Sequence, residues 1–236
     1  MSGQIANYVN PKKITGANMG KVKFNYISKP DDIYKASFDA IKKETDFSPL
    51  DTQLHPIALR MIHATANPDL IKDIRCSKSP IQSGINALNN GATIFCDSEM
   101  VSRGIAKRFL PKNNPVICTL NDPKTTEFAR KNNTTRSAGA VELWREKIGG
   151  SIVVVGNAPT TLFYLLEKIH NDNWDKPELI IGLPIGYIGA IESKQALVNY
   201  AQGIEYITLI SKLGGSSMAS SVINAIIGCN EVSYNV

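Results

Sequence analysis

The stretch Ser151-Ile152-Val153-Val154-Val155-Gly156-Asn157-Ala158-Pro159-Thr160 decides the fold. Its first half is a run of β-branched residues, which is typical of a parallel strand that helices cover on both faces. Gly156 permits a sharp turn, and Pro159 suits the first position of a helix, where a missing amide hydrogen costs nothing. The stretch therefore predicts a buried strand, a tight loop and a helix.

The same unit recurs from residue 92 onward. Short β-rich runs precede amphipathic stretches at 92–96, 116–120, 151–155, 178–183 and 205–210. Strands that alternate with helices form a parallel sheet, because right-handed crossovers place the helices on its faces. We expect an α/β fold of three α/β/α layers around a doubly wound parallel sheet of about five strands. Its strand order should be flavodoxin-like, and ligands of such folds bind beyond the carboxyl ends of the strands.

Two helices should precede this alternation. Pro30-Asp31-Asp32 predicts the start of the first helix, because acidic residues in a first turn suit the helix dipole. The second should begin near Asp51 and end at Asn67-Pro68. Residues 1–26 are polar and basic, so we expect a partly disordered arm followed by a single domain over 27–236.

Composition excludes several classes of protein. The 236 residues carry a net charge of +5 without a long basic run, which fits an anionic small ligand or a solvated surface rather than nucleic acid. The four cysteines form no CxxC pair, which favours reduced thiols in the cytoplasm. With no signal-peptide segment and no apolar run of membrane-spanning length, we expect a soluble cytoplasmic protein without a membrane partner.

The tetrad Arg60-Met61-Ile62-His63 places a guanidinium and an imidazole three residues apart in an apolar segment. On a helix both side chains leave the same face. An imidazole donates and recovers a proton near neutral pH, and an arginine binds a carboxylate through two parallel hydrogen bonds. The pattern alone also fits residues that are merely satisfied at the edge of a core.

Glycine-rich loops should gather at the carboxyl edge of the sheet. They contain Gly156-Asn157, Gly186 and Gly214-Gly215, and the helix starts beside them offer free amides that attract anions. Any one of these loops could be a tight connection, but three at one edge favour a binding site.

Other kinds of site lack their motifs. The chain has no G-x-G-x-x-G, no P-loop and no G-x-S-x-G elbow, which argues against nucleotide binding and a serine hydrolase. The acidic residues are dispersed, so we interpret them as helix caps or solvated groups and expect no metal centre. These acids are Asp97, Glu99, Asp122 and Glu142.

Six motifs together resemble the precorrin-8X methylmutase family of cobalamin biosynthesis, over about residues 27–229. They are Arg60-Met61-Ile62-His63-Ala64, Ile94-Phe95-Cys96-Asp97-Ser98-Glu99-Met100-Val101, Thr134-Thr135-Arg136-Ser137-Ala138, Gly156-Asn157-Ala158-Pro159-Thr160, Gly189-Ala190-Ile191-Glu192-Ser193-Lys194 and Gly214-Gly215-Ser216-Ser217-Met218-Ala219. The resemblance implies an isomerase that moves a methyl group from C-11 to C-12 of the corrin ring. It converts precorrin-8X to hydrogenobyrinate, or cobalt-precorrin-8 to cobyrinate. A flavodoxin-like fold, a homodimer and a polycarboxylate corrinoid substrate are also implied, and the chemistry requires no cofactor.

The resemblance also implies roles for single residues. His63 matches the catalytic histidine, while Ser37 and Arg60 match substrate contacts. Arg136 is a further candidate for binding a substrate carboxylate, although it equally fits a structural ion pair or a helix cap. Met61 and Tyr187 are candidates for contact with the apolar ring face.

The chain departs modestly from the family pattern at Thr65-Ala66, where Cys-Gly is common.

Two other functions stay open on the sequence. One is a carrier that binds a tetrapyrrole without chemistry, and the other, less favoured, is a nucleotide-binding α/β regulator.

Overall fold

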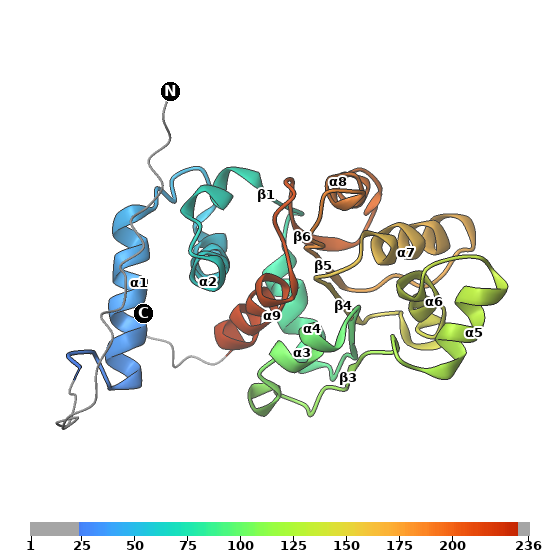
Figure 1. Ribbon diagram of the computed structural model, residues 1–236, viewed down its shortest axis with the longest axis horizontal. Helices are drawn as coiled ribbons and strands as arrows, with labels where there is room; N and C mark the ends of the chain where they lie inside the picture. The colour runs from blue at the N-terminus through green and yellow to red at the C-terminus, as the bar shows by residue number, and fades with distance from the viewer. Residues whose placement is uncertain (1–23, 231–236) are drawn as a thin grey trace, which may run out of the picture.

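A six-stranded sheet runs through the centre of the protein, which a computed structural model describes over residues 24–230, with side chains as far as Gly228 (Figure 1). Its strands are β1 (Ile74–Cys76), β2 (Ile94–Cys96), β3 (Val116–Ile117), β4 (Ile152–Val155), β5 (Leu179–Gly182) and β6 (Glu205–Leu209). They lie in the order β1-β6-β5-β4-β2-β3. Strands β2 to β6 are parallel, so the five predicted strands and their flavodoxin-like order are confirmed.

The prediction missed strand β1, which makes the sheet larger than expected. It pairs antiparallel with β6, with Ile74 opposite Leu209. The three residues Ile-Arg-Cys are too few to show an alternating pattern, and only their pairing with β6 marks them as a strand.

Helices cover both faces of the sheet. One face is packed by α2 (His55–Thr65), α3 (Pro80–Asn89), α4 (Glu99–Gly104) and α9 (Ser216–Asn230). The other face is packed by α6 (Arg136–Glu142), α7 (Pro159–Asn171) and α8 (Ala190–Tyr200). Helices α1 (Pro30–Glu44) and α5 (Pro123–Lys131) lie outside these layers, against α2 and α6 respectively. The 3₁₀ turns are η1 (Thr52–Leu54), η2 (Pro68–Asp73), η3 (Lys107–Phe109) and η4 (Arg145–Lys147).

The pleat of β4 shows why this layering follows from the sequence. Ile152 and Val154 enter the hydrophobic cluster under α9, while Val153 and Val155 enter the cluster under α7. All four side chains are fully buried. A strand that is apolar at every position is therefore consistent with helices on both faces, as the sequence predicted.

The two amino-terminal helices lie where the sequence predicted them. Helix α1 begins at Pro30, while α2 begins at His55 after η1, whose start Asp51 caps by accepting a hydrogen bond from the Gln53 amide at 3.0 Å. Nearly all of the predicted arm, residues 1–26, lies outside the described residues. Within residues 24–230, no helix has both the length and the hydropathy needed to span a membrane.

Candidate active site

Helices α1 and α2 bring Ser37 and His63 together. The Ser37 Oγ lies 3.0 Å from His63 Nδ1, so the two side chains form a hydrogen bond in which either atom can be the donor. His63 is exposed and Ser37 is half-buried. The bond occupies Nδ1, and Nε2 is the ring nitrogen left for a ligand on the exposed side.

Two aromatic rings of α1 support this pair. The ring of Phe38 lies 5.3 Å from the His63 ring in an edge-on arrangement, and the ring of Tyr34 lies 6.0 Å away. The Arg60 guanidinium lies 5.2 Å from the Phe38 centroid and 5.9 Å from the Tyr34 centroid. Because Arg60 and His63 contact the same two rings, the prediction that they share one helix face is confirmed.

The opposite face of α2 explains the position of these groups. Ile57, Met61 and Ile62 are buried in the core on that face, where α2 packs against α9. Met61 has no exposed surface, so the prediction that it contacts a ring-shaped ligand is wrong. The spacing of Tyr34 and Phe38 places them on the helix face that carries Ser37, but the sequence analysis assigned neither residue a role beside His63.

The loop after β4 does not offer free amides. Asp97, which follows β2, accepts hydrogen bonds from the amides of Gly156 at 3.0 Å, Asn157 at 2.7 Å and Ala158 at 2.8 Å. The expectation that these amides bind an outside anion is therefore wrong. Burial raises the pKa of Asp97, and the three amide hydrogen bonds act in the opposite direction.

Glycines join the next two loops at the strand ends. The Gly215 amide donates to the Leu183 carbonyl at 2.9 Å, and the Gly186 amide donates to the Lys212 carbonyl at 3.2 Å. A Cβ on Gly214 would collide with the carbonyl oxygens of Leu183 and Pro184, so the close approach of these loops requires glycine there.

Lys194 of α8 holds one of these loops from inside the protein. Its Nζ donates to the carbonyls of Ser211 at 2.6 Å and Leu213 at 2.7 Å, and the residue has no exposed surface. Burial lowers the pKa of Lys194 to about 8, against a smaller opposing effect of Asp73. The sequence reading placed Lys194 in a polar helix start and missed this role.

Apolar side chains remain exposed beside the joined loops. Tyr187 is 83% exposed and Ile188 is 89% exposed, and the Lys212 ammonium lies 4.7 Å from the Tyr187 ring centroid. Such exposure leaves Tyr187 free to contact an apolar ring face, as the sequence analysis expected.

Arg136 lies with the strand-end loops rather than with His63. It begins α6, which is at the other end of the long axis from α1 and α2 (Figure 1). Thr135 caps this helix by accepting a hydrogen bond from the Ala138 amide at 3.1 Å, and its hydroxyl donates to the Thr160 hydroxyl of α7 at 2.9 Å. The Arg136 side chain is exposed.

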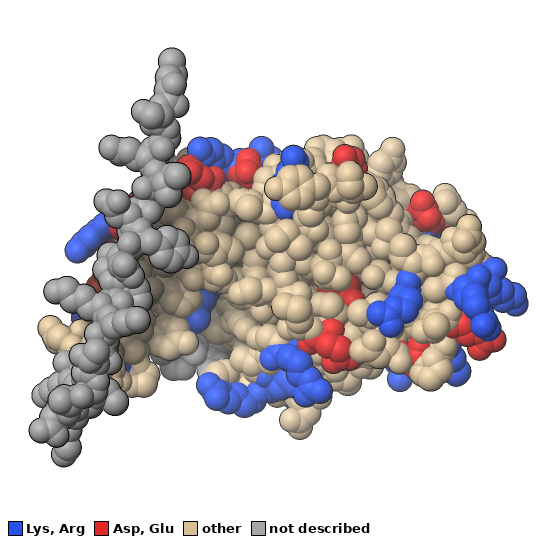
Figure 2. Space-filling model, viewed as in Figure 1, with Lys and Arg blue, Asp and Glu red and all other residues tan. Residues whose placement is uncertain are grey.

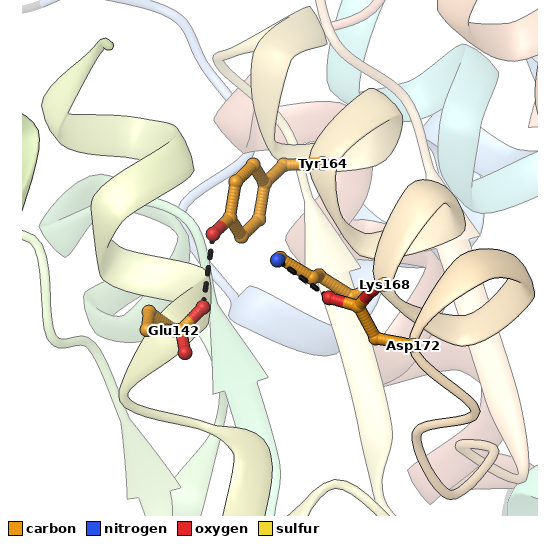
Figure 3. Close-up of polar contacts among 4 residues, drawn as sticks. All are labelled: Glu142, Tyr164, Lys168 and Asp172. Carbon is orange, nitrogen blue, oxygen red and sulfur yellow. Dashed lines mark hydrogen bonds and ion pairs between the residues drawn. The ribbon is translucent and has the colours of Figure 1, made fainter. Parts of the chain in front are cut away.

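Helix α6 is fastened to α7 by a hydrogen-bonded cluster (Figure 3). The Tyr164 hydroxyl donates to Glu142 Oε2 at 2.9 Å, while Lys168 lies 5.1 Å from the Tyr164 ring centroid and pairs with Asp172 at 2.6 Å. Burial and the Glu142 carboxylate raise the pKa of Tyr164 to about 12. Glu142 therefore serves as an acceptor that joins two helices.

Charge is distributed rather than concentrated on the face drawn in Figure 2, where basic and acidic groups are interspersed. Among the described residues, no group of three or more histidine, cysteine, aspartate or glutamate side chains is placed to hold a metal ion.

Comparison with known proteins identifies the family. The pattern of the family described as precorrin-8X methylmutase matches residues 32–229. A precorrin-8X methylmutase from a Sinorhizobium species is 40% identical over 203 residues, which span 86% of this chain and 96% of that protein. The precorrin-8X methylmutase of Pseudomonas aeruginosa is 42% identical over 202 residues, or 86% of this chain and 97% of that protein.

A solved structure agrees with these relatives. The crystal structure of precorrin-8X methyl mutase from Thermus thermophilus superposes with a TM-score of 0.77 at 31% identity, and the match covers 85% of this chain and 96% of that one. The chain therefore belongs to the precorrin-8X methylmutase family of isomerases.

Proposed function

We propose that this chain moves a methyl group from C-11 to C-12 of the corrin ring, converting precorrin-8X to hydrogenobyrinate or cobalt-precorrin-8 to cobyrinate. Membership of the family supports the reaction. The observation that carries the proposal is the 3.0 Å hydrogen bond between Ser37 and His63 beside Arg60, because it orients an exposed imidazole next to a cation.

In this proposal His63 is the catalytic residue. A methyl migration within a conjugated macrocycle needs electrons to shift around the ring, which a temporary proton assists more than a strong nucleophile would. With Nδ1 bound to Ser37, Nε2 gives a proton to the ring system and takes it back after the shift. The reaction is an isomerisation, so this returned proton leaves the atom balance unchanged.

Arg60 and the strand-end residues bind the substrate in this proposal. The corrinoid carries several carboxylates, and the half-buried Arg60 binds one of them through two parallel hydrogen bonds. The amides of Gly156 and Asn157 are occupied by Asp97, so Asn157 would contact substrate through its exposed side chain. The remaining proposed contacts are Ser37, Arg136, Gly186, Gly214 and Gly215.

We also propose a homodimer, which would complete the set of substrate contacts. Because α6 lies at the other end of the long axis from α2, a second copy offers a way for Arg136 and His63 to serve one substrate (Figure 1). Mixing the inactive variants His63→Ala and Arg136→Ala should then restore part of the activity. Light scattering that shows a monomer at assay concentrations would refute the dimer.

The proposed domain extends over residues 27–236, which the family match at 32–229 supports. We place the protein in the cytoplasm, because Cys76, Cys96 and Cys118 are free thiols, as a reducing compartment would keep them.

Absorption spectroscopy of the purified protein with each substrate tests the function. We expect conversion of metal-free or cobalt-containing substrate to a product with the spectrum of the methyl-shifted corrin. A ring nitrogen accepts the proton only in the metal-free substrate, so the pH–rate profiles should differ if both are converted. Binding of both compounds without conversion would replace the isomerase with a carrier.

A further inference from the structure

The strand order of the sheet reverses between β2 and β4. Strand β3 lies on one side of β2, and the later parallel strands β4, β5 and β6 follow on the other side. In open α/β sheets the crevice at such a reversal is the usual ligand position, where helix-start amides bind a phosphate. The loop amides at this point belong to Gly156, Asn157 and Ala158, and they point to a carboxylate of the protein itself.

Asp97 fills this position completely. Its Oδ1 accepts one amide and its Oδ2 accepts two, at 2.7 to 3.0 Å, and the residue is 1% exposed. The surroundings are closed as well, because a Cβ on Gly156 would lie 2.8 Å from Ser216 Cα and 2.9 Å from Val101 Cγ2. An outside anion has no room here while Asp97 is in place.

An ordinary helix cap in the same protein makes a useful contrast. Asp122 at the start of α5 accepts a hydrogen bond from the Lys124 amide at 2.9 Å, in a solvent-exposed setting. Asp97 instead reaches from the loop after β2 to the loop after β4, and it fixes three consecutive amides of a segment about 60 residues further along the chain.

We propose that Asp97 is a positioning residue: it acts as a built-in acceptor for the loop amides at the strand-order reversal, and it sets the backbone of residues 156–158 so that the Asn157 side chain meets the substrate. The proposal rests on the proposed function for the contact between Asn157 and substrate. It also assigns Asp97 a second effect, which is to close the phosphate position of this fold.

The first variant to test is Asp97→Gly, which leaves the three amides without an acceptor and opens space for a small carboxylate. Formate has the same acceptor group as the missing side chain. We expect hydrogen exchange at the amides of 156–158 to be slow in the unaltered protein, fast in the variant, and slow again when formate is added. This measurement needs no substrate, so it tests the hydrogen bonds between Asp97 and the three amides even if the proposed reaction is wrong.

Kinetics of the same variant test the positioning role. We expect kcat/KM to fall by about 100-fold, mainly through KM, because displacement of a binding group by about 1 Å has effects of that order. Formate should bring KM most of the way back to its value in the unaltered protein. Recovery of amide protection without any change in KM would overturn the positioning role. It would still show that the three amides bind the carboxylate.

Two further variants keep the test decisive. Asp97→Asn preserves the shape of the side chain but turns an acceptor into a donor that faces an amide, so its KM should rise and should not respond to formate. Asp122→Gly removes the ordinary cap and should show no formate response in KM. If Asp97→Gly does not fold, Asp97→Asn alone tests the proposal. A normal KM in folded Asp97→Asn would refute it.

Discussion

The helical pair α1–α2 and the strand-end loops use charge in opposite ways. In the helical pair, Ser37 and His63 bond to each other through side chains, and the histidine is exposed. At the strand ends, Asp97 and Lys194 are buried and bond to backbone amides and carbonyls. Exposed polar groups remain available for a ligand, whereas buried charges bonded to the backbone fix the shape of loops.

This contrast separates chemistry from architecture. Substitutions of the polar groups in the helical pair should change turnover or substrate binding more than stability. Substitutions of the buried groups should disturb the loops, which we expect to appear as a change in stability and its pH dependence for Lys194 and as a rise in KM for Asp97. A variant that breaks this division would show that one of the two regions has been assigned the wrong task.

The largest effect is expected for His63→Ala. Turnover should fall by about 10²- to 10⁴-fold, which is the usual contribution of general acid catalysis. The free energy of unfolding should change by about 1 kcal/mol or less, since one exposed hydrogen bond is lost. Absorption assays and urea denaturation measure the two quantities, and the coloured product should still bind.

His170→Ala is the matched control for that variant. His170 is also exposed and hydrogen-bonded, with its Nε2 2.7 Å from the Tyr200 carbonyl oxygen. Its loss should leave turnover unchanged. Near-normal turnover in folded His63→Ala would remove His63 from the mechanism.

Lys194→Met should have the next largest effect, which is a change in how the free energy of unfolding depends on pH. Burial lowers the pKa of Lys194 from 10.5 to about 8, so between these values the unfolded chain binds more protons than the folded one. Stability conferred by neutral Lys194 therefore rises with pH through this window. Between pH 8 and pH 10.5, the free energy of unfolding of the unaltered protein should rise by up to about 3 kcal/mol relative to that of Lys194→Met.

Urea denaturation across the same pH window measures this gain. Lys176→Met is the control, because the exposed Lys176 Nζ also donates to a carbonyl, that of Gln202 at 2.7 Å. Parallel pH curves for the unaltered protein and Lys194→Met would mean that the buried ammonium keeps its charge throughout.

Arg60→Lys should have a smaller effect, confined to binding. Lysine keeps the positive charge but lacks the planar fork, so KM should rise about 10-fold while kcat changes little. Steady-state kinetics separate the two constants. Arg145→Lys is the control, because Arg145 lies 5.8 Å from the Trp174 ring in a comparable contact away from α1 and α2. An unchanged KM with a collapsed kcat would move Arg60 into transition-state stabilisation.

The smallest effect concerns the end of α2. Ala66 adopts a left-handed conformation with φ of 51°, which costs a residue with a side chain about 1 kcal/mol. Ala66→Gly should therefore raise the free energy of unfolding by about 0.5–1 kcal/mol without changing turnover. Ala64→Gly, inside the helix, should lower it by about the same amount. An unchanged or lower denaturation midpoint for Ala66→Gly would contradict the strain.

Much of the fold could be predicted because its signals are local. The run Ile152-Val153-Val154-Val155 and its four counterparts mark buried strands, and Pro30 and Pro159 mark helix starts. Strand β1 could not be predicted, since its three residues form a strand only because β6 lies beside them. The pairing of Arg60 with His63 on one face followed from helical spacing.

The buried charges were beyond the reach of local patterns. An aspartate that binds amides about 60 residues further along the chain leaves no spacing signal, so Asp97 was grouped with caps and solvated acids. Lys194 follows Glu192 and Ser193, which resemble an exposed helix start, yet its Nζ donates to two carbonyls of the β6–α9 loop. Both assignments depend on which loops the fold places side by side.

The sheet has its shortest strands at or near its two edges, with three residues in β1 and two in β3. Short edge strands offer little template for another chain to extend the sheet, and Arg75 in the middle of β1 adds a charge that opposes such pairing. The protein is thereby guarded against edge-to-edge aggregation at high concentration. Any ordered association between copies should accordingly use helix surfaces and leave the sheet at six strands.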